Sequence, residues 1–243
     1  FPTSESPCGL GQKGGVIMTQ KISWLTLIAI SLLLVGLLVW PTESKASSAS
    51  AVSGDATAVR LSGLVNLSLV KAGPIPSTGG SDSEELIGPI NLTLGSILSL
   101  STAGSLEADT TGNLGQGSAS SGVDIVDLTL SALGLLNARV DTVDSATLAR
   151  CVNGVAVCTA AISIQRLKIT GLAEINASAT TPPNTKLTIP GVGSVTINKQ
   201  FKSQPNSKTC SITAMAAEIA VAPLGLVTQS IILAESHSDI TCK

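Results

Sequence analysis

Beyond residue 56, the apolar residues are mostly Val, Ile and Leu in short runs, which Gly, Pro, Ser and Asn separate at the spacing of strands and turns. The segment NTKLTIPGVGSVTINKQF, 184–201, is the clearest unit. Leu187 and Ile189 alternate with polar residues before its Pro-Gly-Val-Gly turn, and the same alternation follows the turn. This is the pattern of a β-hairpin with one buried face. No amphipathic helix of convincing length competes with it. The sequence therefore predicts an all-β, antiparallel, β-sandwich-like single domain.

The same reading assigns ten strands, at 57–71, 86–100, 123–133, 136–149, 160–170, 172–179, 185–189, 194–201, 210–222 and 226–241. Two longer segments, 72–85 and 103–122, are predicted to be loops because they are rich in Gly, Ser and acidic residues. A core of Leu, Ile, Val and Ala predicts two sheets packed about 10 Å apart.

The N-terminal part has the pattern of an export leader. Residues 1–17 are interpreted as non-coding upstream sequence, since the codons before Met18 can form a ribosome-binding site; a real polar tail is the alternative. Residues 18–46 then form a signal peptide or N-terminal membrane anchor, with Lys21 before an apolar helix at 22–40. Small residues at Ser44 and Ala46, or at Ala49 and Ala51, suit signal-peptidase cleavage. Residues 47–56 would be a linker and 57–243 an extracellular or cell-surface β-domain.

Charge and aromatic content exclude several kinds of partner. Beyond residue 46 the chain carries 11 basic and 14 acidic residues, with no basic block to neutralise phosphates. Phe201 is the only aromatic residue of this part, so stacking surfaces for single-stranded nucleic acid or for sugars are absent. We expect no nucleic-acid partner and no cofactor, and contact with the membrane only through 22–40 if the leader is retained.

Four cysteines beyond the leader predict two disulfides in an oxidising compartment. Folding the chain at Pro223-Leu224-Gly225 brings Cys210 and Cys242 to the open end of one hairpin, so we expect this pair to be bonded. Cys151 and Cys158 would then form the second bond. That bond requires a wide or irregular loop, because a two-residue Asn-Gly turn at 153–154 would place Cys151 opposite residue 156.

The only histidine, His237, lies between two acids in a strand-like segment. Glu235, His237 and Asp239 should point to one face of that strand. Such a row can bind a metal or serve in catalysis, but no G-x-S-x-G nucleophile motif accompanies it. We interpret the row as the solvated face of a strand.

Other candidate sites are weaker. Ser68 and Lys71 match the spacing of serine acyl enzymes, but they lie in a predicted strand and lack the companion motifs. The segment 109–113 has oxygen donors for calcium without the ligand spacing of a known loop, and the Gly-rich segment 114–122 lacks phosphate-loop spacing. Four acids, Asp124, Asp127, Asp141 and Asp144, could form a further calcium-binding surface, although the ordinary solubility of a strand face explains them too. Three N-glycosylation sequons begin at Asn66, Asn91 and Asn176, and they would matter only in a eukaryote.

Three stretches of the sequence share a pattern with known exported proteins. They are LGLLNARVDTVDSATLA at 133–149, PNTKLTIPGVGSVTINKQ at 183–200, and the closing segment 212–242, which ends in a cysteine. These stretches resemble the choice-of-anchor P family of exported bacterial proteins. With the strand near 58–70, the likeness covers most of residues 56–242. The resemblance implies a secreted or surface-displayed β-rich domain without an established biochemical role.

The function that these observations favour is an exported, non-enzymatic β-domain with a structural or adhesive role. Its partners would be other envelope proteins or copies of itself, joined through strand edges. The alternatives are a module that binds a small ligand or a divalent metal, and a hydrolase that uses His237.

Overall fold

The computed structural model describes residues 47–243 except 64, 96–97, 133, 135, 171–173, 179, 192 and 223–228. Within these residues every regular element is a β-strand and every strand pairing is antiparallel. This confirms the predicted all-β, antiparallel fold class. No helix in the described part of the chain is long and apolar enough to span a bilayer. The predictions for 1–17, 18–46 and the apolar segment 22–40 lie outside the described residues.

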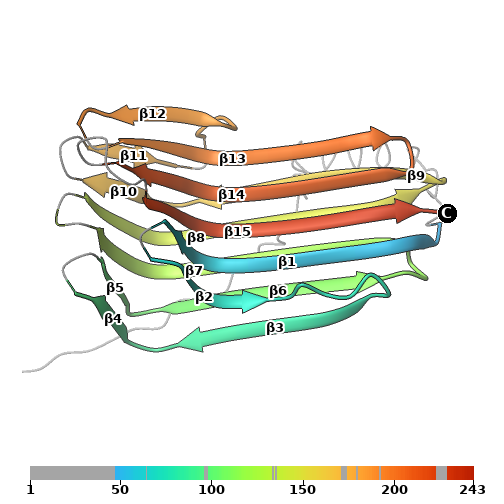
Figure 1. Ribbon diagram of the computed structural model, residues 1–243, viewed down its shortest axis with the longest axis horizontal. Coiled ribbons are helices and arrows are strands. Elements are labelled where there is room, and N and C mark those ends of the chain that lie inside the picture. Colours follow the sequence, from blue (N-terminus) through green and yellow to red (C-terminus); the bar gives the residue numbers. More distant parts are fainter. Residues whose placement is uncertain are drawn as a thin grey trace, which may run out of the picture. The chain divides into compact units, whose positions relative to one another are not determined.

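The strands form two sheets that face each other (Figure 1). In the described part of the chain, one sheet has six strands in the order β12–β13–β14–β15–β1–β2. These strands are β1 (Ala49–Ser62), β2 (Leu67–Ala72), β12 (Thr185–Ile189), β13 (Gly193–Asn206), β14 (Thr209–Val221) and β15 (Gln229–Cys242).

The other sheet has nine strands around two long central ones, β7 (Ser118–Ala132) and β8 (Leu136–Val152). One half of this central pair is flanked by β6 and β9, with β3 beyond β6; the other half is flanked by β5 and β10, with β4 and β11 beyond them. The shorter strands are β3 (Gly80–Ile87), β4 (Ile90–Leu94), β5 (Leu98–Thr102), β6 (Ser105–Asn113), β9 (Val155–Ile164), β10 (Leu167–Thr170) and β11 (Ile175–Ala177).

Three sequence-based assignments are wrong. Residues 47–56, predicted as a linker, contain the first half of β1, which pairs along its length with β15. The predicted loops 72–85 and 103–122 contain most of β3, all of β6 and the start of β7. β6 was not recognised as a strand because most of its residues are polar. Its side chains nevertheless alternate between buried and exposed, with Leu106, Ala108 and Thr110 in the buried set.

The side-chain alternation reverses along one line that crosses both sheets. In β1 the inward-facing residues are even-numbered from Val52 to Ala56 and odd-numbered from Val59, and in β15 the inward set shifts between Leu233 and Ser236. At this line, which we call the interruption line, the strand pairing skips one residue on each strand. The skipped residues are Val70, Ala58, Ala234, Ala216 and Asn198 in the six-stranded sheet, and Asp127 and Asp141 in the nine-stranded sheet. Val70, Ala234, Asn198 and Asp127 have positive φ angles of 51–52°. A left-handed residue turns the following side chain to the opposite face.

Two separate apolar clusters fill the space between the sheets. Among the residues that the structure describes, the larger cluster, the main core, contains 34 buried side chains, all of them Leu, Ile, Val or Ala. The smaller, the cysteine cluster, has 11; they are Ala49, Val52, Ala119, Ala149, Cys151, Ala156, Cys158, Cys210, Ile212, Ile240 and Cys242. The expectation of an almost wholly aliphatic core therefore holds for only one part of the interior.

A layer of buried hydroxyl groups joins the two sheets between these clusters. The hydroxyl layer consists of Thr110, Ser121, Ser145, Thr147, Ser236 and Ser238, all at most 2 % exposed. Across the sheets, the Ser145 and Ser236 Oγ atoms lie 2.8 Å apart, and Thr147 Oγ1 lies 2.9 Å from Ser238 Oγ. The Ser121 hydroxyl donates to the His237 carbonyl at 2.7 Å. Each hydroxyl of this layer thus has a partner, as buried polar groups require.

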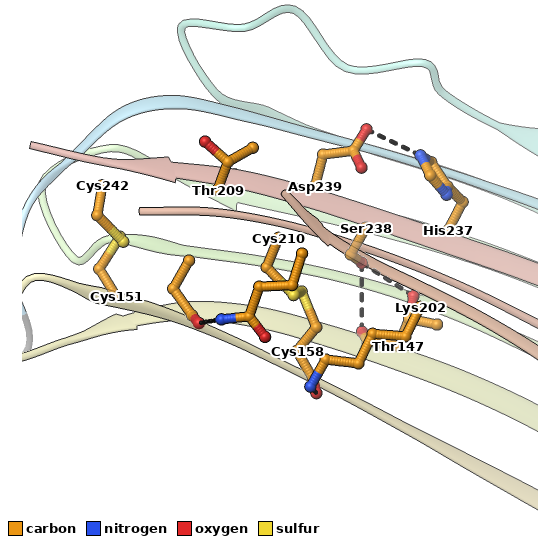
Figure 2. Close-up of a disulfide and its surroundings, with 12 residues drawn as sticks. Thr147, Cys151, Cys158, Lys202, Thr209, Cys210, His237, Ser238, Asp239 and Cys242 are labelled. Carbon is orange, nitrogen blue, oxygen red and sulfur yellow. Dashed lines mark hydrogen bonds and ion pairs between the residues drawn. A yellow bond between two sulfur atoms is a disulfide. The ribbon is translucent and has the colours of Figure 1, made fainter. Parts of the chain in front are cut away.

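All four predicted cysteines form disulfides, but the predicted pairing is wrong. The bonds join Cys151 to Cys242 and Cys158 to Cys210, so each one links the two sheets (Figure 2). The tight Asn153-Gly154 turn does form, with both φ angles positive, and it places Cys151 opposite Ala156. In the other hairpin the register places Cys210 opposite Ile240.

The inward orientation of the cysteines decides the pairing. Even-numbered residues of β14 and β15 at this end, which include Cys210 and Cys242, face the nine-stranded sheet. Cys151 and Cys158 of the nine-stranded sheet face the six-stranded sheet in return. The bonded Cα atoms are 5.6 and 6.1 Å apart, so the sheets approach much more closely here than the usual 10 Å.

Small side chains permit this close approach of the sheets, and a larger side chain at Gly54 should therefore destabilise the domain. A Cβ atom on Gly54 would lie 2.6 Å from both Ser121 Oγ and Thr110 Oγ1. We expect Gly54→Ala to lower the free energy of unfolding by about 1–3 kcal/mol, because the hydroxyl layer must shift to make room. Gly115→Ala is the matched control, since its nearest neighbour, Asn113 Oδ1, would lie at 3.4 Å. Denaturant unfolding measures both; equal stability of the two variants would contradict the expectation.

Candidate functional site

The candidate residues of β15 share one face, as predicted, and that face is the outer face of the six-stranded sheet. Glu235, His237 and Asp239 alternate with Ser236 and Ser238, which point inward to the hydroxyl layer. β15 is a central strand, with β14 on one side and β1 on the other. The row therefore meets side chains from both neighbouring strands.

His237 lies between a hydroxyl and a carboxylate. Its Nε2 atom is 2.8 Å from Asp239 Oδ2, and its Nδ1 atom is 2.8 Å from Thr213 Oγ1 (Figure 2 shows the contact with Asp239). Ser53 donates a hydrogen bond to the same Asp239 oxygen at 3.1 Å. Asp55 of β1 is the cross-strand neighbour of His237.

Electrostatics favour the charged forms of the His237–Asp239 pair. The hydrogen bond to Asp239 raises the pKa of His237 above its ordinary 6.5, against the effect of burial. Burial would raise the pKa of Asp239, but hydrogen bonds from His237, Ser211 and Ser53 and the charge of His237 outweigh it, so that pKa lies below 3.8. The pair is thus an ion pair in mildly acidic solution.

Glu235 is buried although it lies on an outer face. It is 5 % exposed, and the Nη2 atom of Arg60 lies 2.6 Å from its carboxylate oxygens. Burial raises the pKa of Glu235, and the Arg60 charge opposes that rise. Arg60 faces this side of the sheet because the alternation of β1 reverses at Ala58. The prediction of a solvated strand face is therefore wrong for Glu235.

The order hydroxyl, imidazole, carboxylate in Thr213, His237 and Asp239 resembles a nucleophile relay. When His237 is neutral and donates from Nε2 to Asp239, its Nδ1 accepts from the Thr213 hydroxyl. Acyl transfer also needs N–H donors aimed at the developing oxyanion. Thr213 and His237 are paired partners in the ladder between β14 and β15, so regular strand pairing surrounds the relay. Three hollows among the described residues are lined by other side chains.

The acids proposed as a calcium surface are only partly brought together. Asp124 and Asp144 are direct cross-strand partners, and Glu107 of β6 lies beside Asp124. Burial, with the hydrogen bond and charge of Asp144, raises the pKa of Asp124 to about 6. Asp127 and Asp141 belong to the interruption line instead, and Asp141 pairs with Arg166 at 2.9 Å. Among the described residues, no group of three or more His, Cys, Asp or Glu side chains is placed to hold a metal ion.

The other candidates lie in strands or turns. Ser68 and Lys71 are in β2, as predicted. The segment 109–113 is the end of β6 rather than a turn, and 114–122 contains a short turn and the start of β7 rather than one flexible loop. The sequon residues Asn66, Asn91 and Asn176 are all exposed.

Sequence reasoning missed the neighbours of His237. Ser53 and Arg60 come from β1, far away in the sequence, and Thr213 comes from the preceding strand β14. No motif marks any of them. Their only signal was the alternation of their own strands, and that signal reverses at the interruption line in β1.

Comparison of the chain with protein-family models, with curated proteins and with solved structures finds no match.

The His237–Asp239 pair predicts a pH-dependent contribution to stability. The raised pKa of His237 gives stability below about pH 6.5 that is lost as the pH rises through that raised pKa. The lowered pKa of Asp239 gives stability above about pH 3.8 that is lost as the pH falls through the lowered value. We expect His237→Gln to cost about 1 kcal/mol at pH 5, after allowance for solvent screening, and clearly less at pH 9.

Denaturant unfolding at both pH values measures this difference. Lys186→Gln, which removes an exposed charge in β12, is the control and should show no such window. An equal loss for His237→Gln at pH 5 and pH 9 would show that the ion pair does not contribute.

Proposed function

We propose that this chain is an exported β-domain with a structural or adhesive role in the cell envelope or outside the cell. The observation that carries the proposal is the pair of disulfides between the sheets. Stable disulfides of this kind belong to oxidising compartments outside the cytoplasm. The apolar segment 22–40 supports export, and the likeness to the choice-of-anchor P family supports display at the cell surface or secretion.

The proposed role is non-enzymatic. The side chain of His237 is held by Asp239 and Thr213 on the outer face of a regular sheet. Glu235 is occupied by Arg60. These contacts support a role for the polar row as a stabilising network across β1, β14 and β15. This role does not require that the row catalyse a reaction.

Association through strand edges is the proposed means of adhesion, and most described edges are guarded. On one side of the sandwich, Glu84 and Asp82 of β3 accept hydrogen bonds from the backbone N–H groups of Lys71 and Gly73 at 2.6 and 2.8 Å. On the other side, Lys202 and Gln204 donate to carbonyl groups of β9 at 3.0 and 2.9 Å. Charges and satisfied backbone groups oppose the addition of a further strand.

β4 is an edge strand of a different kind. Its sequence, Ile-Asn-Leu-Thr-Leu, has no charge, and it pairs only with β5. Ile87, just before it, is 74 % exposed. An antiparallel pair of two β4 strands centred on Leu92 would place apolar side chains opposite apolar ones on one face. We therefore propose β4 as the edge through which copies of the domain associate.

Export predicts a defined mature protein. The Ser47 hydroxyl accepts a hydrogen bond from the Gly154 N–H at 3.0 Å, and the Ala49 N–H donates to the Leu114 carbonyl at 2.9 Å. Cleavage after Ala51 would remove both residues, so we expect cleavage after Ala46 and a mature chain that starts at Ser47. Mass analysis of the protein from the extracellular and envelope fractions should give this N-terminus with two disulfides. Free thiols, or a chain confined to the cytoplasm, would contradict the proposed export.

Edge association predicts a specific cross-link. In a β4 pair centred on Leu92, the two Leu92 Cα atoms would be about 4.5–5.5 Å apart, within reach of a disulfide. We expect Leu92→Cys to form a covalent dimer under oxidising conditions. Leu187→Cys in the Lys186-bearing edge strand β12 is the matched control and should remain monomeric. Non-reducing electrophoresis across a concentration series measures both; a monomeric Leu92→Cys protein would reject β4 as the associating edge.

A further inference from the structure

The cysteine cluster forms an end of the sandwich that the hydroxyl layer separates from the main core. This cysteine end consists of residues 49–52, 149–158, 209–212 and 240–242. The hydroxyl layer lies next to it, and the main core fills the interior beyond that layer.

The cysteine end buries little apolar surface apart from its sulfur atoms. Four of its seven other cluster members are alanines, namely Ala49, Ala119, Ala149 and Ala156. Hydrophobic stabilisation grows with the apolar area removed from water, so alanines contribute little. Hydroxyl–hydroxyl contacts in the adjacent layer replace hydrogen bonds to water and add only modestly to the closed state. The bonds from Lys202 and Gln204 at the rim can be exchanged for water in the same way.

The disulfides therefore supply the main constraint that holds this end closed. Each bond joins a strand of one sheet to a strand of the other, across Cα distances of 5.6 and 6.1 Å. Two unbonded thiols at the same positions need more room, because nonbonded sulfur atoms stay at van der Waals separation. Reduction of both bonds therefore removes the main constraint that holds this spacing.

We propose that the sandwich closes in two steps: the main core forms in the reduced chain, and the cysteine end closes only when the two disulfides form. Each bond forms as two thiols lose two protons and two electrons. A disulfide of the oxidising compartment, either small or on a thiol oxidase, takes up the electrons and becomes two thiols. The inference concerns the folding of the domain and does not depend on its proposed role.

The disulfide pairing favours this order. The bonded residues are 91 and 52 positions apart in the sequence, and each pair joins opposite sheets. Cysteines in the same sheet are closer in sequence, since Cys151 and Cys158 share one hairpin and Cys210 and Cys242 share another. The cross-sheet pairs become the nearest partners only after the sheets face each other, which is the arrangement that the main core imposes.

Hydrogen–deuterium exchange on the purified mature protein, oxidised and then fully reduced, tests the proposal. We expect amides of 149–158, 209–212 and 240–242 to exchange at least about a hundredfold faster after reduction, as in local opening. Amides beside the main core, at 128–132, 136–140, 217–221 and 231–233, should change by less than about threefold. Reoxidation with glutathione disulfide should restore the slow exchange.

Variants without the thiols provide a second measurement. The paired variants Cys151→Ala/Cys242→Ala and Cys158→Ala/Cys210→Ala each leave one cross-sheet bond, and the fourfold alanine variant leaves none. Fast exchange at the cysteine end should appear fully only in the fourfold variant. Retained protection there, or simultaneous loss of protection in the main core, would each overturn the two-step order and show a single cooperative unit.

Discussion

The alternation of side chains along each strand, and its reversal at one line, is the constraint on which the other features depend. Strands that cross the molecule present one set of residues to the interior on one side of the interruption line and the opposite set on the other. The reversal brings aliphatic residues inward on one side of the line, and alanines and the serines of the hydroxyl layer inward on the other. It also turns Arg60 outward, where it meets Glu235. A buried carboxylate without such a partner would be strongly destabilising.

The interior changes in character along the same strands. β7, β8 and β15 contribute large aliphatic residues to the main core and then serines and threonines to the hydroxyl layer. Small side chains let the sheets converge, and convergence brings the four cysteines within bonding distance. The hydroxyl layer and the disulfides are thus two consequences of the same narrowing of the sandwich. An extracellular setting suits this architecture, since the covalent links substitute for a large apolar core at that end.

The polar row on β15 forms a network of side chains that spans three strands of the six-stranded sheet. An acid, an imidazole and a second acid lie on one face, and a threonine hydroxyl completes the order found in nucleophile relays. Each of these groups is held by a neighbour on an adjacent strand, and the surrounding backbone is engaged in the ladder. The network ties β1, β14 and β15 together on the side of the sheet away from the cores.

Local patterns in the sequence determined the fold class, most of the aliphatic strands, the single face shared by Glu235, His237 and Asp239, and the participation of four cysteines in disulfides. These features follow from the two-residue period of a strand, which nearby residues alone express. The polar strands β3 and β6, the partners of His237 and the pairing of the cysteines were decided only by the tertiary structure. The hairpin that contains Cys151 illustrates the reason. Its Asn-Gly turn can be recognised in the sequence, and the register of that turn places Cys151 opposite Ala156 instead of Cys158. No residue near the turn indicates that Cys151 bonds to Cys242 on the opposing sheet. Contacts between sheets depend on which residues face inward and on how closely the layers approach, and both are properties of the assembled sandwich.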